Sequence, residues 1–183
     1  MILRTVSAAL LAFPLLVSAA TYTTIDNEKS QIEFHYEQMG VNMSGNFTDI
    51  SGQINFDSTQ PEKAEANIEV KMASVDTGSD EADDEIVKKD WFNADSYPDA
   101  VFTTTKIEKK AADSFEVTGL LNIKGHEQEI QFPATVTEAD DAVSFTGSFS
   151  LLRGDYAIGE GAWSKFDIVA NDIRVDFTLI ATE

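Results

Sequence analysis

The chain has 183 residues, of which 32 are acidic and 13 basic, and its formal net charge is −19 at pH 7. A surface this negative repels phosphate backbones and anionic lipid headgroups, which argues against nucleic acid as a partner. The sequence contains no cysteine, which excludes disulfides, thiolate metal sites, a cysteine nucleophile and lipid attachment through an N-terminal cysteine.

The first twenty residues, MILRTVSAALLAFPLLVSAA, have the features of a secretory signal peptide. Arg4 lies near the start, an apolar run follows, and small residues precede polar sequence, so cleavage is expected after Ala19 or Ala20. We therefore expect residues 1–20 to be removed and residues 21–183 to form one exported domain. The mature chain keeps 12 basic and 32 acidic side chains and is long enough to bury a substantial core.

The next part of the chain alternates apolar and polar residues with a period of two. Ile32, Phe34 and Tyr36 alternate with polar neighbours, and Ile68 and Val70 do the same. Strands with one apolar and one polar face are typical of antiparallel sheets with one side in water. We expect strands near 30–37, 43–57 and 64–76.

The segment SDEADDEIVKKDWF, residues 79–92, has a helical pattern. Its acidic residues come first and its lysines late, as the helix dipole favours, and Ala82 and Ile86 begin an apolar stripe. We expect a helix at about residues 80–90 that covers one open end of the fold.

Five more alternating stretches follow, and they predict strands near 100–109, 114–124, 127–137, 142–153 and 169–181. Eight strands at regular spacing predict a sandwich or a closed antiparallel barrel, and closure would remove the exposed strand edges. Gly45, Gly52, Gly119 and Gly147 lie inside strand patterns, where glycine indicates a bulge or a sharp bend. Pro133 indicates a bulge or a strand end.

Several motifs in this order resemble the YceI-like family. The central one is SVDTGSDEADDEIVKKDWFNADSYPDAVFTTTKIE at 74–108. The others are SQIEF at 30–34, GNFTDISGQINFD at 45–57, VTGLLNIKGHEQEI at 117–130 and LLRGDYAIG at 151–159. The resemblance runs from about Asp26 to the C-terminus.

The resemblance implies an eight-stranded antiparallel lipocalin-like barrel with one capping helix, exported to the periplasm. It also implies a long apolar tunnel that holds a polyisoprenoid or another long-chain amphiphile. Two positions depart from the family, because Lys29 and Gln38 stand where many members carry histidines. Headgroup contacts through those histidines therefore do not carry over to this chain.

The inward-facing aromatic and aliphatic residues can be interpreted in two ways. Small barrels either fill their interior with side chains or hold one ligand; the sequence alone favours a plain core, and the resemblance favours a ligand tunnel. Under that interpretation the ligand-binding residues are Phe34, Tyr36, Phe47, Phe56, Trp91, Phe92, Phe102, Phe145, Phe149, Leu151, Arg153 and Tyr156. Trp91 and Phe92 would close one end of the tunnel.

Arg153 and Asp155 lie where a strand gives way to a glycine-rich loop. One interpretation is a local ion pair between them that shapes the turn. The other places Arg153 at the tunnel mouth, where its N–H groups would donate to a quinone carbonyl or a phosphate oxygen.

The sequence lacks the features expected of a metal site or of a catalytic nucleophile. The acidic residues from Asp80 to Glu85 lack the ligand spacing of a calcium loop, and His35 and His126 have no spaced ligand partner for zinc. The serines lack a G-x-S-x-G context. We expect no catalytic residue, no metal and no cofactor other than a bound isoprenoid lipid or quinone.

Together these features predict a non-enzymatic periplasmic protein that transports or stores a long-chain isoprenoid lipid, with a ubiquinone-type molecule first among the candidates. Its partners would be that lipid or a fatty amphiphile, with a transient membrane or membrane-protein contact for delivery and a homodimer as further options. Two alternatives remain: an acidic stress-response or interaction protein with a filled barrel, and a lipid-modifying enzyme.

Overall fold

The computed structural model describes residues 21–57, 59–139 and 141–182. The expected signal peptide and its cleavage site lie outside the described residues. The strands are β1 (Thr21–Ile25), β2 (Gln31–Gln38), β3 (Val41–Phe47), β4 (Ile50–Asp57), β5 (Glu65–Lys71), β6 (Val75–Asp76), β7 (Asp99–Lys109), β8 (Ser114–Ile123), β9 (His126–Ala139), β10 (Ala142–Leu152) and β11 (Asp172–Thr182). One α-helix, α1 (Asp80–Ile86), lies between β6 and β7 among the described residues.

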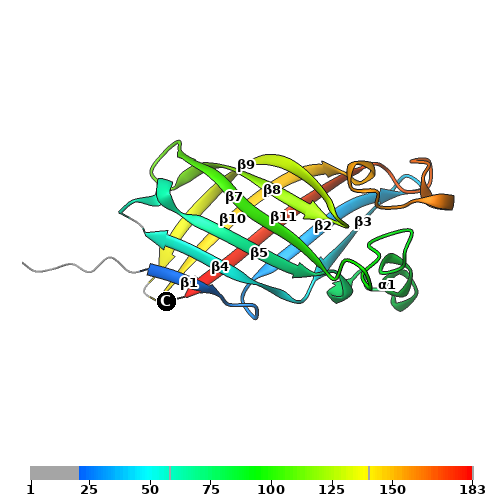
Figure 1. Ribbon diagram of the computed structural model, residues 1–183, viewed down its shortest axis with the longest axis horizontal. Coiled ribbons are helices and arrows are strands. Elements are labelled where there is room, and N and C mark those ends of the chain that lie inside the picture. The colour runs from blue at the N-terminus through cyan, green and yellow to red at the C-terminus, as the bar shows by residue number, and fades with distance from the viewer. Residues whose placement is uncertain (1–20, 58, 140, 183) are drawn as a thin grey trace, which may run out of the picture.

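These strands form one antiparallel sheet that closes into a barrel (Figure 1). The sheet order is β1-β4-β5-β7-β8-β9-β10-β11-β2-β3-β6, and a pairing of β1 with β11 closes the ring. β1 and β2 lie in succession along β11, β3 and β4 form the next interrupted strand, and β5 continues into β6. Counted in this way, the barrel has eight strands, as the sequence predicts.

The strand bounds correct the sequence-based expectations in three places. The first strand begins nine residues earlier than expected, with β1, and is interrupted at residues 26–30. The strand expected at 43–57 is interrupted at residues 48–49, and a short 3₁₀ helix (Met72–Ser74) interrupts the one expected at 64–76. The expected helix at about 80–90 ends at Ile86, and turns carry the chain on to β7.

Two of the strand glycines make room for an aromatic ring instead of forming bulges. Gly45 pairs with Phe34, and Gly147 pairs with Phe177, in ladders that show no register shift. A Cβ at Gly45 would lie 2.5 Å from the Phe34 ring, and one at Gly147 would lie 2.6 Å from the Phe177 ring. Of the bulge or sharp bend predicted at each of these two glycines, the bulge is therefore wrong, and the absent side chain instead lets the cross-strand ring lie over the backbone.

The other two glycines lie beside irregular pairing. Gly119 pairs with Thr104, next to a register shift in the β7–β8 ladder. Gly52 has a φ of +138° and precedes a register shift between β1 and β4. Pro133 does not end β9, but the ladder between β9 and β10 stops at Ala134, because proline has no N–H to donate.

The two ends of the barrel differ. Both termini of the described chain lie at one end, where a floor of buried side chains closes the interior: Tyr22, Phe56, Val143 and Ala181. At the other end lie α1 and the loop of residues 153–171 between β10 and β11 (Figure 1). The helix expected to cover an open end is thus at an end, but it shares that position with this loop.

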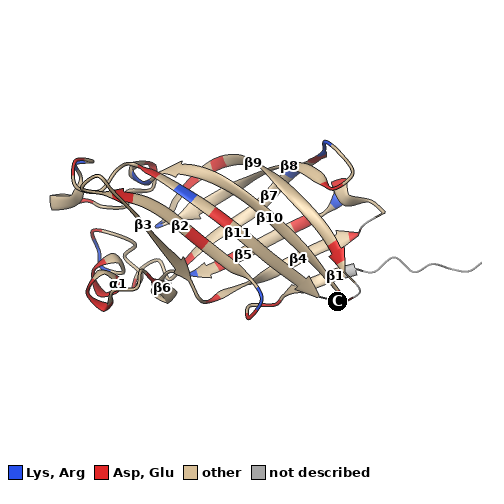
Figure 2. Ribbon diagram, turned by 180° about the vertical axis from the view of Figure 1, so that it is seen from behind, with Lys and Arg blue, Asp and Glu red and all other residues tan. Residues whose placement is uncertain are grey.

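Acidic residues are spread along the strands and gather on α1 (Figure 2). The alternation along each strand separates these charges from the interior: in β8 the residues Phe115, Val117, Leu121 and Ile123 are all buried. This separation is the physical reason that a chain so rich in acids can still enclose an apolar interior.

Candidate ligand cavity

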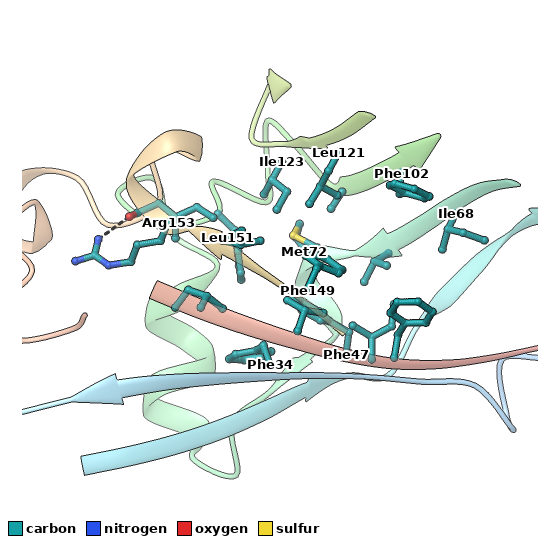
Figure 3. Close-up of a pocket in the computed structure, with 18 of the residues that line it drawn as sticks. Phe34, Phe47, Ile68, Met72, Phe102, Leu121, Ile123, Phe149, Leu151 and Arg153 are labelled. Atoms are coloured by element: carbon teal, nitrogen blue, oxygen red, sulfur yellow. Dashed lines mark hydrogen bonds between the residues drawn. The ribbon is translucent and has the colours of Figure 1, made fainter. Parts of the chain in front are cut away.

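The barrel encloses a cavity of about 540 Å³. This volume is in the range of about 300–1,000 Å³ that is usual for ligand pockets. Figure 3 shows the apolar side chains that surround it, from Ile68 and Phe102 on one side to Leu151 and Arg153 on the other. Eight strands leave room for one ligand when the interior is not filled by side chains, and here it is not filled.

Aromatic rings form much of the cavity wall. Phe132 on β9 contacts the rings of Phe102, Phe149 and Phe177 at centroid distances of 5.4–5.5 Å. On the opposite side Phe34 lies 5.4 Å from Phe47. Such pairs hold one another in place, so the wall is preformed for an apolar guest.

Ten of the twelve residues that the sequence assigns to ligand binding line this cavity: Phe34, Tyr36, Phe47, Trp91, Phe92, Phe102, Phe145, Phe149, Leu151 and Arg153. Phe56 does not, because it packs edge-on against Phe145 at 5.2 Å and belongs to the floor. Tyr156 does not either. It is 1% exposed beside Asp155, and burial raises the pKa of its hydroxyl to about 12.

The sequence-based assignment missed part of the wall, both on the strands, where Phe132 and Phe177 also line the cavity, and in the loop of residues 153–171. Ile158, Trp163 and Val169 from this loop line the cavity, and the Trp163 ring lies 5.3 Å from that of Trp91. Ile158 and Trp163 lie outside the expected strands, so only the tryptophan, as a large aromatic in a glycine-rich loop, could have indicated them. Val169 begins the strand expected at 169–181 but lies before β11.

Arg153 holds this loop together from inside. Its side chain is 1% exposed and donates to the backbone carbonyls of Ile158 (2.6 Å), Gly159 (3.3 Å), Trp163 (2.9 Å), Lys165 (3.3 Å), Val169 (2.9 Å) and Ala170 (3.0 Å). The guanidinium carbon also lies 4.8 Å from the centre of the Phe166 ring.

Both sequence-based interpretations of Arg153 therefore need correction. Asp155 is exposed and is not among the ion-pair partners of Arg153. The side chain does line the cavity, yet its five N–H groups are engaged by six carbonyls and are not free for a headgroup. Burial lowers the pKa of Arg153, but an arginine stays charged in proteins, so the carbonyl dipoles must solvate it.

A second buried cation fastens the loop to the turn between β8 and β9. Lys124 is 6% exposed, and its Nζ donates to Ala157 O and to Glu160 Oε2, both at 2.7 Å. The hydrogen bond from Lys124 is the main cause that lowers the pKa of the Glu160 carboxyl from its usual value.

This pair predicts a specific pH dependence of stability. Because the folded-state pKa of Glu160 is lowered, its contribution is present above the unfolded pKa of about 4.5 and is lost as the pH falls through the lower folded value. We expect the free energy of unfolding of Glu160→Gln to be below that of the parent at pH 7, with the difference shrinking as the pH falls below about 4.5. Urea unfolding at several pH values measures it; a difference that does not shrink at all in acid would contradict the assignment.

Apart from Arg153, the polar side chains that line the cavity lie in two places. One group is Tyr36, Gln38, Thr77, Ser79, Glu81 and Glu85, from β2 and the α1 region, and we call it the α1 mouth. The other is Glu65 and Thr104, where β5 and β7 separate and the Thr104 hydroxyl bridges the backbone of Ala66. The wall between these two places is apolar.

Residues 21–57, 59–139 and 141–182 contain no group of three or more His, Cys, Asp or Glu side chains placed to hold a metal ion. Within the same ranges, no helix is both long and apolar enough to span a membrane. His35 lies on the outer face of β2, 2.9 Å from Asp176.

A closed eight-stranded antiparallel barrel around one apolar cavity defines the class of lipocalin-like barrels. Within this class, residues 23–181 match the YceI-like domain, so the chain belongs to the YceI-like family. A UPF0312 protein of Shewanella baltica is 32% identical over 184 residues, covering 96% of this chain and 92% of that protein.

Solved structures show the same architecture. BcnA of Burkholderia cenocepacia superimposes with a TM-score of 0.83 at 32% identity, covering 86% of this chain and 99% of BcnA. A polyisoprenoid binding domain from Saccharophagus degradans superimposes with a TM-score of 0.73 over 89% of this chain and 99% of that domain. At 17% identity this second likeness concerns the fold alone.

Proposed function

We propose that this protein binds a polyisoprenoid or another long-chain amphiphilic lipid in its cavity and serves to carry or store it. The observation that carries the proposal is the unfilled cavity of about 540 Å³, whose wall between its two polar regions is apolar. Membership of the YceI-like family and the shared fold with a polyisoprenoid binding domain support the same ligand class.

The physical need for such a protein follows from the cost of hydrating hydrocarbon. Each methylene exposed to water costs about 0.8 kcal/mol, so a chain of twenty carbons is insoluble as a monomer. A dry, aromatic-lined cavity removes most of this cost without any covalent step. A ubiquinone-type ligand, location in the periplasm and delivery by membrane contact remain predictions from the sequence and the resemblance.

The placement of titratable groups favours binding over catalysis. Glu65, Glu81 and Glu85 lie where polar residues line the cavity, and Arg153 is engaged by backbone carbonyls. A catalytic acid or base would have to reach the reacting atom within about 2.6–3.2 Å, and the middle of the wall offers only apolar side chains. A barrel filled by its own side chains, the other alternative, does not fit the cavity.

The test compares lipids extracted from the purified parent with those from two tryptophan variants. Val175 on β11 is half-buried and lines the cavity, so Val175→Trp places a large ring inside it. Thr146 on β10 is exposed, so Thr146→Trp adds the same ring to the outer surface, where strands tolerate it. We expect a long-chain lipid in extracts of the parent and of Thr146→Trp, and about tenfold less in extracts of Val175→Trp. The added ring takes up space in the cavity, so the lipid loses contact with the wall worth at least about 1.4 kcal/mol.

Mass spectrometry of organic extracts gives the result, and circular dichroism shows whether each variant is folded. If the parent carries no lipid after expression in a bacterium with export, or if folded Val175→Trp retains as much as the parent, the proposal fails.

A further inference from the structure

The α1 mouth offers unpaired neutral hydrogen-bonding groups to whatever occupies the cavity. The side chains of Tyr36, Gln38 and Ser79 line the cavity and have no hydrogen-bond partner among the described residues. Burial, and to a lesser degree the charge of Asp83, raises the pKa of the Tyr36 hydroxyl, so it remains a donor. These groups can donate to a carbonyl, hydroxyl or ether oxygen.

The same mouth is acidic. Glu81 and Glu85 line the cavity from α1, and the helix carries three more acids, Asp80, Asp83 and Asp84. Figure 2 shows them together at this end of the barrel. Lys88 pairs with Glu85 at 2.7 Å, and no lysine lines the cavity within the described chain.

Arg153 does not make the α1 mouth favourable for an anionic headgroup, although it is positively charged. Its N–H groups are already engaged by the carbonyls of residues 158–170, so it can give an anion no hydrogen bond without losing its own. A phosphate needs charge-assisted hydrogen bonds to replace its water. The α1 mouth supplies carboxylates instead.

We propose that the α1 mouth accepts an uncharged, oxygen-bearing headgroup, held by Tyr36, Gln38 and Ser79, and rejects phosphate and carboxylate headgroups through Glu81 and Glu85. This inference rests on the proposed function and narrows its ligand class. A cationic headgroup is attracted by the same carboxylates but also loses part of its hydration on binding. The two effects oppose each other for the cation, because Glu81 is exposed to solvent and Glu85 is already paired, whereas for an anion the lost hydration and the repulsion add.

The test uses three ligands that share one C20 prenyl tail and differ at the headgroup: the alcohol, the monophosphate and the primary amine. Both tryptophans of the chain, Trp91 and Trp163, line the cavity near the mouth, so their fluorescence reports binding to lipid-free protein. In 50 mM salt we expect the alcohol to bind about tenfold more tightly than the monophosphate, from like-charge repulsion. At 1 M salt, where the Debye length is about 3 Å, this ratio should shrink.

A double variant locates the effect. Glu81→Gln with Glu85→Gln should raise the affinity for the monophosphate severalfold, and by a much larger factor than it changes the affinity for the alcohol. The matched control, Glu62→Gln with Glu138→Gln, removes the same charge from exposed positions toward the opposite end and should change neither affinity.

The outcomes separate this inference from the proposed function. If none of the three ligands binds, the proposed function itself fails. If the monophosphate binds as tightly as the alcohol, if the amine binds more tightly than the alcohol, or if the two double variants behave alike, only the headgroup selection by the α1 mouth is overturned.

Discussion

Replacing Arg153 with methionine should destabilise the protein by about 3–5 kcal/mol, as when one partner of a buried charged network is removed. The methionine keeps the apolar stem but withdraws all the donors that six carbonyls of the loop accept. Each buried carbonyl left without a partner costs about 1–3 kcal/mol unless the loop opens to water. For a domain of this size the melting temperature should fall by about 10 °C or more.

The same substitution should weaken binding of every ligand, whatever its headgroup. Trp163 and Val169, which Arg153 holds through their carbonyls, form part of the cavity wall. A prenyl alcohol and a plain hydrocarbon of equal length should therefore lose affinity together. If only the alcohol were affected, Arg153 would be a headgroup ligand after all, and its place in the loop would be of secondary importance.

Two control variants accompany this experiment. Arg174 is exposed on β11 and pairs with Asp176 at 2.7 Å, so Arg174→Met removes an arginine from the surface. Asp155→Ala tests the ion pair that the sequence suggested. Both should change the free energy of unfolding by no more than about 0.5 kcal/mol; a large loss from Asp155→Ala would restore that pair as a stabilising contact.

Gly52→Ala should be destabilising by about 2–4 kcal/mol, because backbone strain and overpacking act at the same position. Gly52 has a φ of +138°, where side chains are strained. In addition, its Cβ would overlap the carbonyl of Asn67 and lie 2.9 Å from Ile68 Cα on the neighbouring strand β5. These are backbone atoms of a paired strand, so they cannot move aside as a flexible side chain could.

Gly40→Ala is the matched control. Gly40 also has a positive φ, +79°, but nothing lies within 4 Å of its Cβ position, so only the conformational penalty of roughly 1–2 kcal/mol applies. Urea unfolding of both variants measures the difference. Equal losses at the two positions would mean that the close approach of β4 and β5 contributes nothing.

The antiparallel strands and much of the cavity lining could be predicted from the sequence because they depend on local alternation. Phe34, Phe47, Phe102 and Phe149 lie on apolar faces of alternating strands, and they do point into the cavity. A period of two sets which face a side chain takes, whatever its partners are. Among the residues predicted to bind the ligand, Phe56 and Tyr156 lie outside the cavity lining. The period does not encode how deep along a strand a residue lies, nor the path that a loop takes.

The sequence by itself thus determined the antiparallel strands, their apolar faces and the position of α1. It left a sandwich and a closed barrel open; the resemblance to the YceI-like family implied the barrel, and the pairing of β1 with β11 closes it. Only the tertiary structure decided that Arg153 donates to the carbonyls of the loop of residues 153–171, and that Trp163 and Val169 complete the cavity wall. It also decided that Gly45 and Gly147 make room for aromatic rings. The physical reason is the range of the contacts involved. Alternation and helix polarity act between neighbours in the chain, whereas a buried guanidinium is satisfied by carbonyls up to 17 residues away, and these meet only once the barrel end has formed.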